Sequence, residues 1–160
     1  MKTYRQLVEE AAESVEEIMP WDLEEMLADG EPPLLLDVRE PGEYDAMHIE
    51  GALNVPRGVL EPACEYDYDE TEPALVTGRD RKIVVICRSG HRSVLAARAM
   101  QQLGFSNVIS LKTGMRGWND YEQPMVDKDG KPVDIETADE FFETRLRPEQ
   151  IDPARRERDL

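Results

Sequence analysis

The chain has 160 residues, a length typical of one domain, and 40% of them are hydrophobic, which is enough to build a core. Its formal net charge is −16, from 35 acidic and 19 basic residues. This balance argues against nucleic acids and anionic membranes as partners, because both bind basic surfaces. The first residues contain no apolar stretch that could span a bilayer, so we expect a cytoplasmic protein.

The N-terminal segment, residues 1–16, is predicted to be a helix that precedes the main domain. Helical periodicity runs over residues 4–17, where glutamates separate the apolar positions Leu7, Val8, Ala11, Ala12, Val15 and Ile18. We expect this helix to pack on an edge of the domain rather than to bind a partner. A second helix begins at Pro20 and closes at Gly30.

Short apolar runs then alternate with helical segments. The runs that predict strands are LLLDV (34–38), GALNVP (51–56), KIVVIC (82–87) and NVISL (107–111). The segments that predict helices are EPGEYDAM (40–47), SVLAARAMQQLG (93–104) and GMRGWNDY (114–121), and an acidic loop or short helix covers 63–73. This alternation, with connections long enough for crossovers, predicts an α/β fold with a parallel sheet.

The composition changes from Asp127, and we predict that residues 126–160 form a charged extension. Phe141, Phe142 and Leu146 could dock one helix of this extension on the domain. The last ten residues are expected to be frayed or disordered, because six of them are charged.

The stretch from Cys87 to Ser93, CRSGHRS, is the strongest candidate site. Cys87 follows a buried strand and precedes a helix, and ligands of open α/β sheets bind at this edge. A loop of this kind directs backbone N–H groups inward, and the helix dipole with Arg88 and Arg92 favours a nucleophilic thiolate. Gly90 lets the loop close around the sulfur. The alternative is a buried, inert cysteine.

The spacing of the arginines favours sulfur over phosphate chemistry. Tyrosine-phosphatase-type loops place an arginine six positions after the cysteine. Here Arg92 stands five positions after Cys87, and the sixth position is Ser93. The loop is one residue short for a tetrahedral phosphate, and a smaller cradle suits a sulfur atom bound to the cysteine as a persulfide.

Three blocks in this order resemble the single-domain rhodanese (thiosulfate sulfurtransferase) family. They are LLLDVREPGEYDAMHIEGALNVP (34–56), CRSGHRS (87–93) and AARAMQQLGFSNVISLKTGMRGW (96–118), and the likeness covers about residues 17–125. One departure is Thr113, where family members usually have a second glycine; the single Gly114 is expected to permit the turn.

The resemblance implies a three-layer fold with a central, mostly parallel five-stranded sheet and helices on both faces. It implies that Cys87 takes sulfur from an anionic donor such as thiosulfate and holds it as a persulfide. The sulfur then passes to cyanide, a thiol or a small protein acceptor. Backbone amides of residues 88–92 would stabilise the sulfur. Arg88 stands where thiosulfate users have arginine and would hold the donor, while Arg92 would add charge or brace the loop.

The remaining candidates receive mainly structural interpretations. The resemblance makes Asp37 and Arg39 a pair that supports the rim of the site, and makes His48 a brace rather than a general base. Ser89 and His91 lie within the substrate-binding loop. His91 could tune the thiolate or contact an acceptor, but we expect its side chain to point outward, as loop side chains usually do.

Cys64 is either a resolving cysteine for Cys87 or an incidental loop thiol. Two cysteines are too few for a disulfide framework, and neither forms the short spacing of a zinc site with His48 or His91. No metal and no organic cofactor are implied.

Two other functions stay open. One is a phosphatase or arsenate reductase on the same fold, against which the loop length argues. The other is a docking or regulatory module with a vestigial loop. We expect a monomer or a weak dimer.

Overall fold

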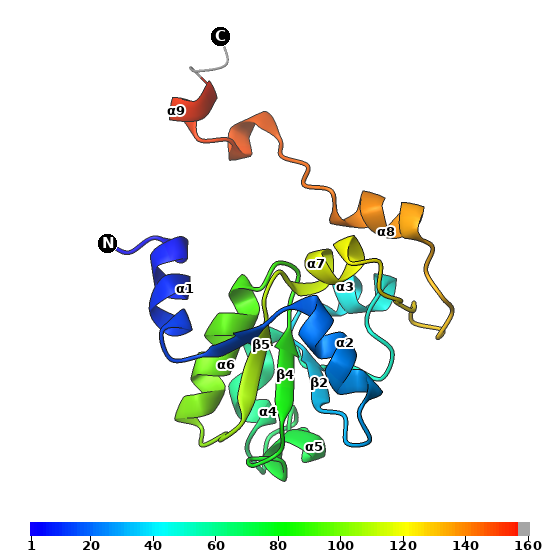
Figure 1. Ribbon diagram of the computed structural model, residues 1–160. Helices are drawn as coiled ribbons and strands as arrows, with labels where there is room; N and C mark the ends of the chain where they lie inside the picture. The colour runs from blue at the N-terminus through cyan, green and yellow to red at the C-terminus, as the bar shows by residue number, and fades with distance from the viewer. Residues whose placement is uncertain (157–160) are drawn as a thin grey trace.

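The computed structural model describes residues 1–156, which form an α/β domain with a five-stranded sheet (Figure 1). All neighbouring strands pair in parallel, in the order β1 (Glu16–Ile18), β5 (Val108–Leu111), β4 (Ile83–Ile86), β2 (Leu34–Asp37) and β3 (Leu53–Asn54). The predicted α/β fold with a five-stranded sheet is therefore confirmed. The central strand β4 is buried along its whole length, which explains its unbroken run of isoleucine and valine.

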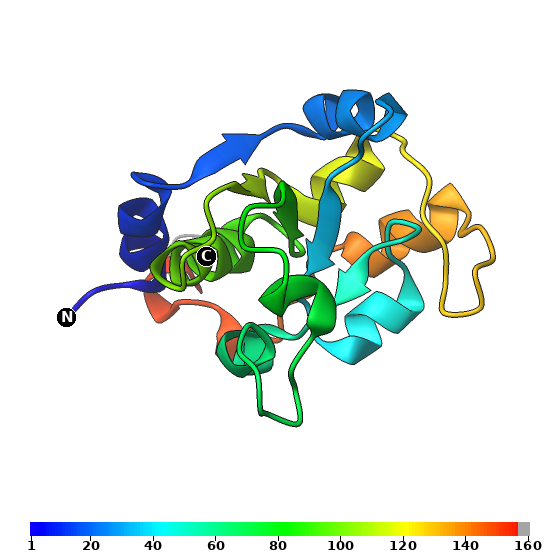
Figure 2. The ribbon, with the colours of Figure 1, turned by 90° about the horizontal axis from the view of Figure 1, so that it is seen from below.

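Helices cover both faces of the sheet (Figure 2). One face packs on α6 (His91–Gln102), α4 (Leu60–Ala63) and α5 (Pro73–Val76) through a buried cluster that includes Leu60, Leu75, Ala97 and Met100. The other face packs on α2 (Pro20–Ala28), α7 (Gly114–Asp120) and α8 (Ile135–Phe142) through Leu23, Met115, Trp118 and Phe142. The short helices α3 (Pro41–Ala46) and η1 (Arg57–Val59) follow β2 and β3. Each face of the sheet thus has its own apolar core.

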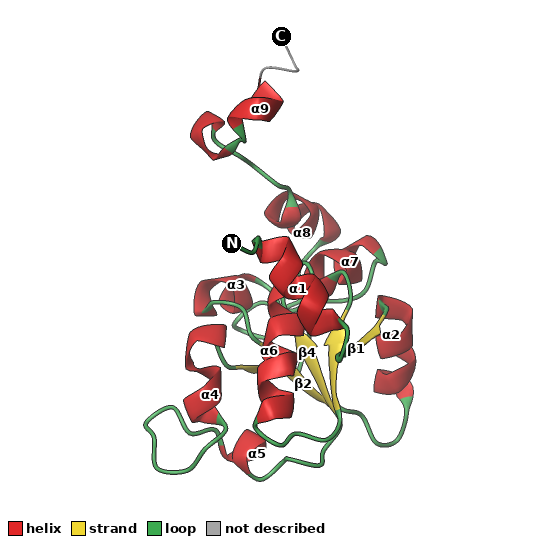
Figure 3. Cartoon of the chain, turned by 90° about the vertical axis from the view of Figure 1, so that its left-hand side faces the viewer, coloured by secondary structure: helices red, strands yellow, loops and turns green. Residues whose placement is uncertain are grey.

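The predicted N-terminal helix is too long. Helix α1 spans Tyr4–Ala12 and begins at a capping box made by Thr3 and Gln6. Residues Glu16–Ile18 form an edge strand instead, because Val15 and Ile18 are buried by pairing next to β5 rather than by a helical face. Helix α1 lies against α6 (Figures 1 and 3), where the Gln101 side chain donates a hydrogen bond to the Ser14 carbonyl at 2.7 Å.

The C-terminal extension is docked through α8 and then leaves the domain. Ala138 and Phe142 are buried. Phe141 and Leu146 are 37% and 53% exposed, so two of the three expected docking residues do not dock, because α8 turns Phe141 outward and ends before Leu146. Beyond α8 the chain runs away from the domain and carries η2 (Pro148–Gln150) and α9 (Pro153–Arg156) (Figures 1 and 3).

Of the ten terminal residues predicted to be frayed, residues 157–160 lie outside the described part of the chain. Residues 152–156 are exposed, and four of them form α9. No helix within residues 1–156 has both the length and the apolar character to cross a bilayer.

Candidate active site

The thiol of Cys87 lies at the carboxyl end of β4 and is held by hydrogen bonds. Its side chain is 1% exposed. The backbone N–H groups of Gly90 and Ser93 point at Sγ, at 3.1 and 3.3 Å. The Ser93 hydroxyl lies 3.3 Å from Sγ and 2.7 Å from the Ser110 hydroxyl of β5. Of the residues 88–92 that were expected to supply amides, only Gly90 donates to Sγ, and Ser93 adds the second amide. This set of donors would stabilise negative charge on the sulfur.

The bend of the loop depends on glycine. Gly90 is the residue before α6 and has a φ of 91°, in the left-handed region that favours glycine. A Cβ at this position would lie 3.0 Å from the Thr113 backbone nitrogen, closer than ordinary contacts. The loop can therefore turn tightly enough to place the first turn of α6 beneath the sulfur.

Helix α7 fixes the start of the loop. The N–H groups of Met115 and Arg116 donate to the Cys87 and Arg88 carbonyls at 2.8 and 3.0 Å. Two consecutive residues, Thr113 and Gly114, have positive φ values of 69° and 59°. The single glycine, Gly114, was expected to permit this turn, but the turn requires both residues to adopt the left-handed conformation. Thr113 does so despite its branched side chain, which is a strained arrangement.

The two arginines of the loop have different partners. Arg92 donates twice to the Glu43 carboxylate of α3, with both bonds 2.9 Å long. Burial acts to raise the pKa of Glu43, but the hydrogen bonds from Arg92 and from the Glu40 backbone outweigh it, and the pKa lies below its ordinary value. Arg88 donates to the Phe142 carbonyl of α8 at 2.8 Å. Arg88 forms no ion pair with any described residue, so its charge is held in place without being neutralised.

A cavity of about 230 Å³ opens beside the thiol, and Tyr4 of α1 is part of its wall. The other lining residues are Cys87, Arg88, Ser89, His91 and Arg92. The Tyr4 ring packs edge-on against the His91 ring, with 5.9 Å between their centroids. Burial and negative charge at Cys87 raise the pKa of Tyr4, against the opposing effect of Arg92, so its hydroxyl keeps its proton.

Tyr4 was absent from the residues proposed from the sequence. The helical spacing of Tyr4, Val8 and Ala11 places the phenol on the same face of α1 as the buried Ala11, but it does not show that this face meets the Cys87 loop. His91, which was expected to point outward, is exposed but packs against this tyrosine.

Asp37 and Arg39 form a fully buried ion pair behind the site. Arg39 donates to both carboxylate oxygens of Asp37, at 2.8 to 3.2 Å, and to the Met47 carbonyl at 2.7 Å. Burial raises the pKa of Glu43, and the hydrogen bonds from Arg92 and the Glu40 backbone lower it. The Arg39 charge adds a smaller effect that also lowers this pKa. The side chains of the pair are therefore linked to the Cys87 loop through Glu43 and Arg92.

His48 does not belong to the wall of the cavity beside the thiol. Its ring stacks on Tyr44 with 3.7 Å between centroids, and Nδ1 lies 2.7 Å from the Tyr44 carbonyl. Its backbone exchanges two 2.9 Å hydrogen bonds with Val126, which anchors the start of the C-terminal extension. This position agrees with a bracing role.

Cys64, for which the sequence allows either a resolving cysteine or an incidental loop thiol, lies at the end of α4 and is fully buried. Burial raises its pKa to about 11, with a smaller opposing effect from Arg79. A thiol of this kind stays protonated at neutral pH, which argues against a resolving role. Within residues 1–156 both cysteines are free thiols, and no cluster of three His, Cys, Asp or Glu side chains is placed to bind a metal ion.

Comparison with known proteins places this site in a family. Residues 19–121 match the model of the rhodanese-like domain. The Bacillus subtilis protein named "Putative sulfur carrier protein YrkF" is 36% identical over 109 residues, and the match spans 68% of this chain and about half (54%) of that protein. A protein of Allochromatium vinosum named "Sulfurtransferase" is 32% identical over 118 residues, which span 72% of this chain and 99% of that one.

A solved structure is also similar. A Rhodopseudomonas palustris protein of unknown function, described as a "Possible Tyrosine Phosphatase", superposes with a TM-score of 0.68 at 28% identity, over 78% of this chain and 95% of that chain. The family match covers well over half of this chain and contains the Cys87 loop, and the sulfurtransferase relative aligns over nearly its full length. The chain belongs to the rhodanese-like domain family.

Proposed function

We propose that this protein is a sulfurtransferase that carries sulfane sulfur on Cys87, with thiosulfate as a donor and cyanide or a thiol as the acceptor. The observation that carries the proposal is the position of Sγ, which receives two backbone N–H groups at the start of α6 and has an uncompensated arginine beside its cavity. The sulfurtransferase relative from Allochromatium supports the same chemistry.

The reaction proceeds in two steps in which atoms and electrons balance. The Cys87 thiolate attacks the outer sulfur of thiosulfate, the S–S bond of the donor breaks, and sulfite leaves with its electron pair. An acceptor then attacks the outer sulfur of the Cys87 persulfide, and the electron pair of the broken bond returns to Sγ. Arg88 would hold the anionic donor, and the amides of Gly90 and Ser93 would stabilise charge on Sγ in both steps.

Phosphatase or arsenate chemistry is the less favoured alternative. Ser93 occupies the sixth position after Cys87 and turns its N–H group and hydroxyl toward Sγ. Arg92 at the fifth position donates to the Glu43 carboxylate through both terminal nitrogens of its guanidinium. An oxyanion with three terminal oxygens would therefore lack the arginine that such loops supply. A pure docking role is also less favoured, because a vestigial loop would not need Gly90 and Ser93 to direct their N–H groups at Sγ.

A cytoplasmic setting belongs to the proposal, since the free thiol of Cys87 has to persist between turnovers and the cytoplasm keeps thiols reduced. The acceptor partners would be small thiols or a small sulfur-carrying protein. The chain would work as a monomer or weak dimer without a metal or organic cofactor.

Intact-mass analysis after incubation with thiosulfate tests the proposal. We expect the wild type and Cys64→Ser to gain one sulfur atom, and Cys87→Ser to gain none. Cyanide should then remove the added sulfur and release thiocyanate. Absence of the mass gain in the wild type, together with turnover of an aryl phosphate or arsenate, would show that the assignment is wrong.

A further inference from the structure

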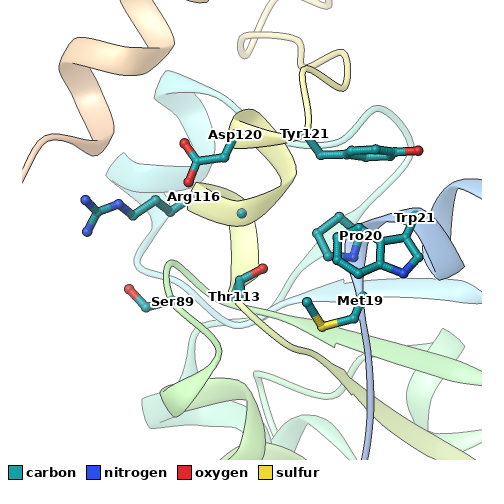
Figure 4. Close-up of a pocket in the computed structure, with 9 residues that line it drawn as sticks. Met19, Pro20, Trp21, Ser89, Thr113, Arg116, Asp120 and Tyr121 are labelled. Atoms are coloured by element: carbon teal, nitrogen blue, oxygen red, sulfur yellow. The ribbon is translucent and has the colours of Figure 1, made fainter.

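A second cavity, of about 460 Å³, lies between the start of α2 and helix α7 (Figure 4). Its apolar wall comes from Met19, Pro20, Trp21 and Tyr121. Trp21 is 49% exposed and Tyr121 is 38% exposed, and their rings pack edge-on with 5.8 Å between centroids. Aromatic rings that remain open to solvent beside a cavity form a surface that an apolar ligand can cover.

Ser89 connects this cavity to the active site, because it lines both cavities. The cavity beside Cys87 has about half the volume and is lined by polar and charged side chains. Cys87 itself is 1% exposed. An acceptor must bring its thiol into the small cavity, so the rest of an organic acceptor has to lie outside it. The cavity on the other side of Ser89 is the adjoining space with room for that part.

We propose that the cavity between α2 and α7 binds the organic part of the sulfur acceptor, and that this acceptor is a small uncharged thiol with an aromatic or branched apolar body. The inference rests on the proposed sulfur transfer. The volume lies within the range of small-molecule sites. The charge is also informative, because the net charge of the chain is −16, which disfavours an anionic thiol.

Arg116 does not alter this expectation. Its stem lines the cavity, but in Figure 4 its guanidinium points away from Trp21 and Tyr121. That guanidinium donates instead to the Thr144 hydroxyl at 3.3 Å. The apolar wall thus faces no inward-directed cation, and the ligand that fits it best is neutral.

Thr113 shapes the cavity on the side nearest Ser89 (Figure 4). A Cβ on Gly117 would overlap the Thr113 hydroxyl, so the threonine side chain fills the space that Gly117 leaves. The left-handed backbone at Thr113 is a strained conformation that glycine would relieve. We infer that this side chain sets the size of acceptor that the cavity accepts.

The step that the cavity serves is the second half of the reaction. The acceptor thiolate forms an S–S bond to the outer sulfur of the Cys87 persulfide. The bond between that sulfur and Sγ breaks, and its electron pair returns to Sγ as the thiolate. No oxidant or reductant is consumed, and the acceptor leaves as a persulfide.

Single-turnover discharge of the persulfide tests the inference. The full chain is loaded with thiosulfate, freed of donor, and mixed with phenylmethanethiol, 2-mercaptoethanol or cyanide. In the wild type we expect phenylmethanethiol to react more efficiently than 2-mercaptoethanol at equal thiolate concentration. In Trp21→Ala the ratio of the phenylmethanethiol rate to the cyanide rate should fall about tenfold, because loss of the aromatic wall removes roughly 1–2 kcal/mol of apolar contact.

The matched control is Tyr66→Ala, which removes a 63% exposed tyrosine from the loop between α4 and α5. It should leave the ratio at the wild-type value. Thr113→Gly enlarges the cavity and should shift the preference toward bulkier thiols. Equal ratios in the wild type and Trp21→Ala, or discharge by protein acceptors with no preference among small thiols, would overturn the inference.

A binding measurement separates this inference from the proposed function. Benzyl methyl sulfide has the same body as phenylmethanethiol but no thiol, and its binding to Cys87→Ser can be followed by calorimetry. We expect binding that Trp21→Ala abolishes and Tyr66→Ala preserves. If the wild type forms no persulfide while this binding is present, the proposed function fails and the cavity stands; if the persulfide forms without this binding, the cavity assignment fails alone.

Discussion

Arg88 and Arg92 lie in the same loop but donate hydrogen bonds to different groups, and the partner determines what each arginine can do. Arg92 faces a carboxylate and Arg88 faces a carbonyl. A carboxylate cancels the charge of its arginine, whereas a carbonyl only orients the guanidinium. Of the two, Arg88 therefore carries the charge that an anionic donor would meet, and Arg92 fixes the loop to α3.

This difference predicts separate effects of substitution. Arg88→Ala should raise the KM for thiosulfate about tenfold, since one charged hydrogen bond to the donor is lost, and should leave the Tm close to that of the wild type. Arg88→Lys should restore part of the loss. Steady-state thiocyanate formation and thermal unfolding measure both quantities. An unchanged KM in Arg88→Ala would assign the donor to another group.

The pair of Glu43 and Arg92 predicts a pH-dependent contribution to stability. Because the pKa of Glu43 is lowered by folding, its contribution is complete above the ordinary value of 4.5 and is lost as the pH falls through the folded-state pKa. Glu43→Gln should therefore lower the free energy of unfolding by about 0.5–1 kcal/mol at neutral pH, since solvent screens a pair that is about a quarter to a third exposed.

Urea unfolding of the wild type and Glu43→Gln at pH 7 and near pH 3 measures this contribution. The difference between the two proteins should shrink at the lower pH. A difference that stays constant would mean that the ion pair adds nothing.

At the scale of elements, α8 is the part of the extension that matters to the site. Its last residue, Phe142, is 3% exposed, and the carbonyl of the same residue receives the hydrogen bond from Arg88. The neighbouring Phe141 is 37% exposed. The two adjacent phenylalanines of α8 thus differ in burial, with one in the core and the other at the surface.

The two phenylalanines supply a matched pair of variants. Phe142→Ala should lower the free energy of unfolding by about 3 kcal/mol, because it leaves a cavity in the core between α7 and α8. Phe141→Ala should lower it by less than about 1 kcal/mol. Equilibrium unfolding in urea gives both values. Similar losses in the two variants would show that α8 is not docked through Phe142.

The elements also show what the sequence could predict. The central strands and α6 were predictable because their signals are local: a run of apolar residues, then Gly90 and a helical pattern. Strand β1 was missed because three residues are too few to show a strand periodicity within a segment that reads as helix. Tyr4, Glu43 and the Phe142 carbonyl could not be assigned to the site, because each reaches it from an element far away in the sequence.

At the scale of the whole molecule, the charge of −16 opposes folding through self-repulsion. Salt screens this repulsion, since the Debye length falls from about 30 Å at 0.01 M to about 3 Å at 1 M. We expect the Tm at neutral pH to rise when NaCl is increased from about 0.01 M to about 0.5 M. Near the isoelectric point of 4.5 the same increase should have a smaller effect. A Tm that falls with NaCl at neutral pH would contradict this expectation.

The contact between Arg88 and the Phe142 carbonyl has a consequence for synthesis on the ribosome. The two residues are 54 positions apart, so at roughly 5–20 residues per second the carbonyl emerges roughly 3–11 s after the arginine. Until then α8 cannot contact Arg88 of the Cys87 loop, although α1 with Tyr4 has already been synthesised. The Arg88 side of the loop therefore stays open in a nascent chain for several seconds.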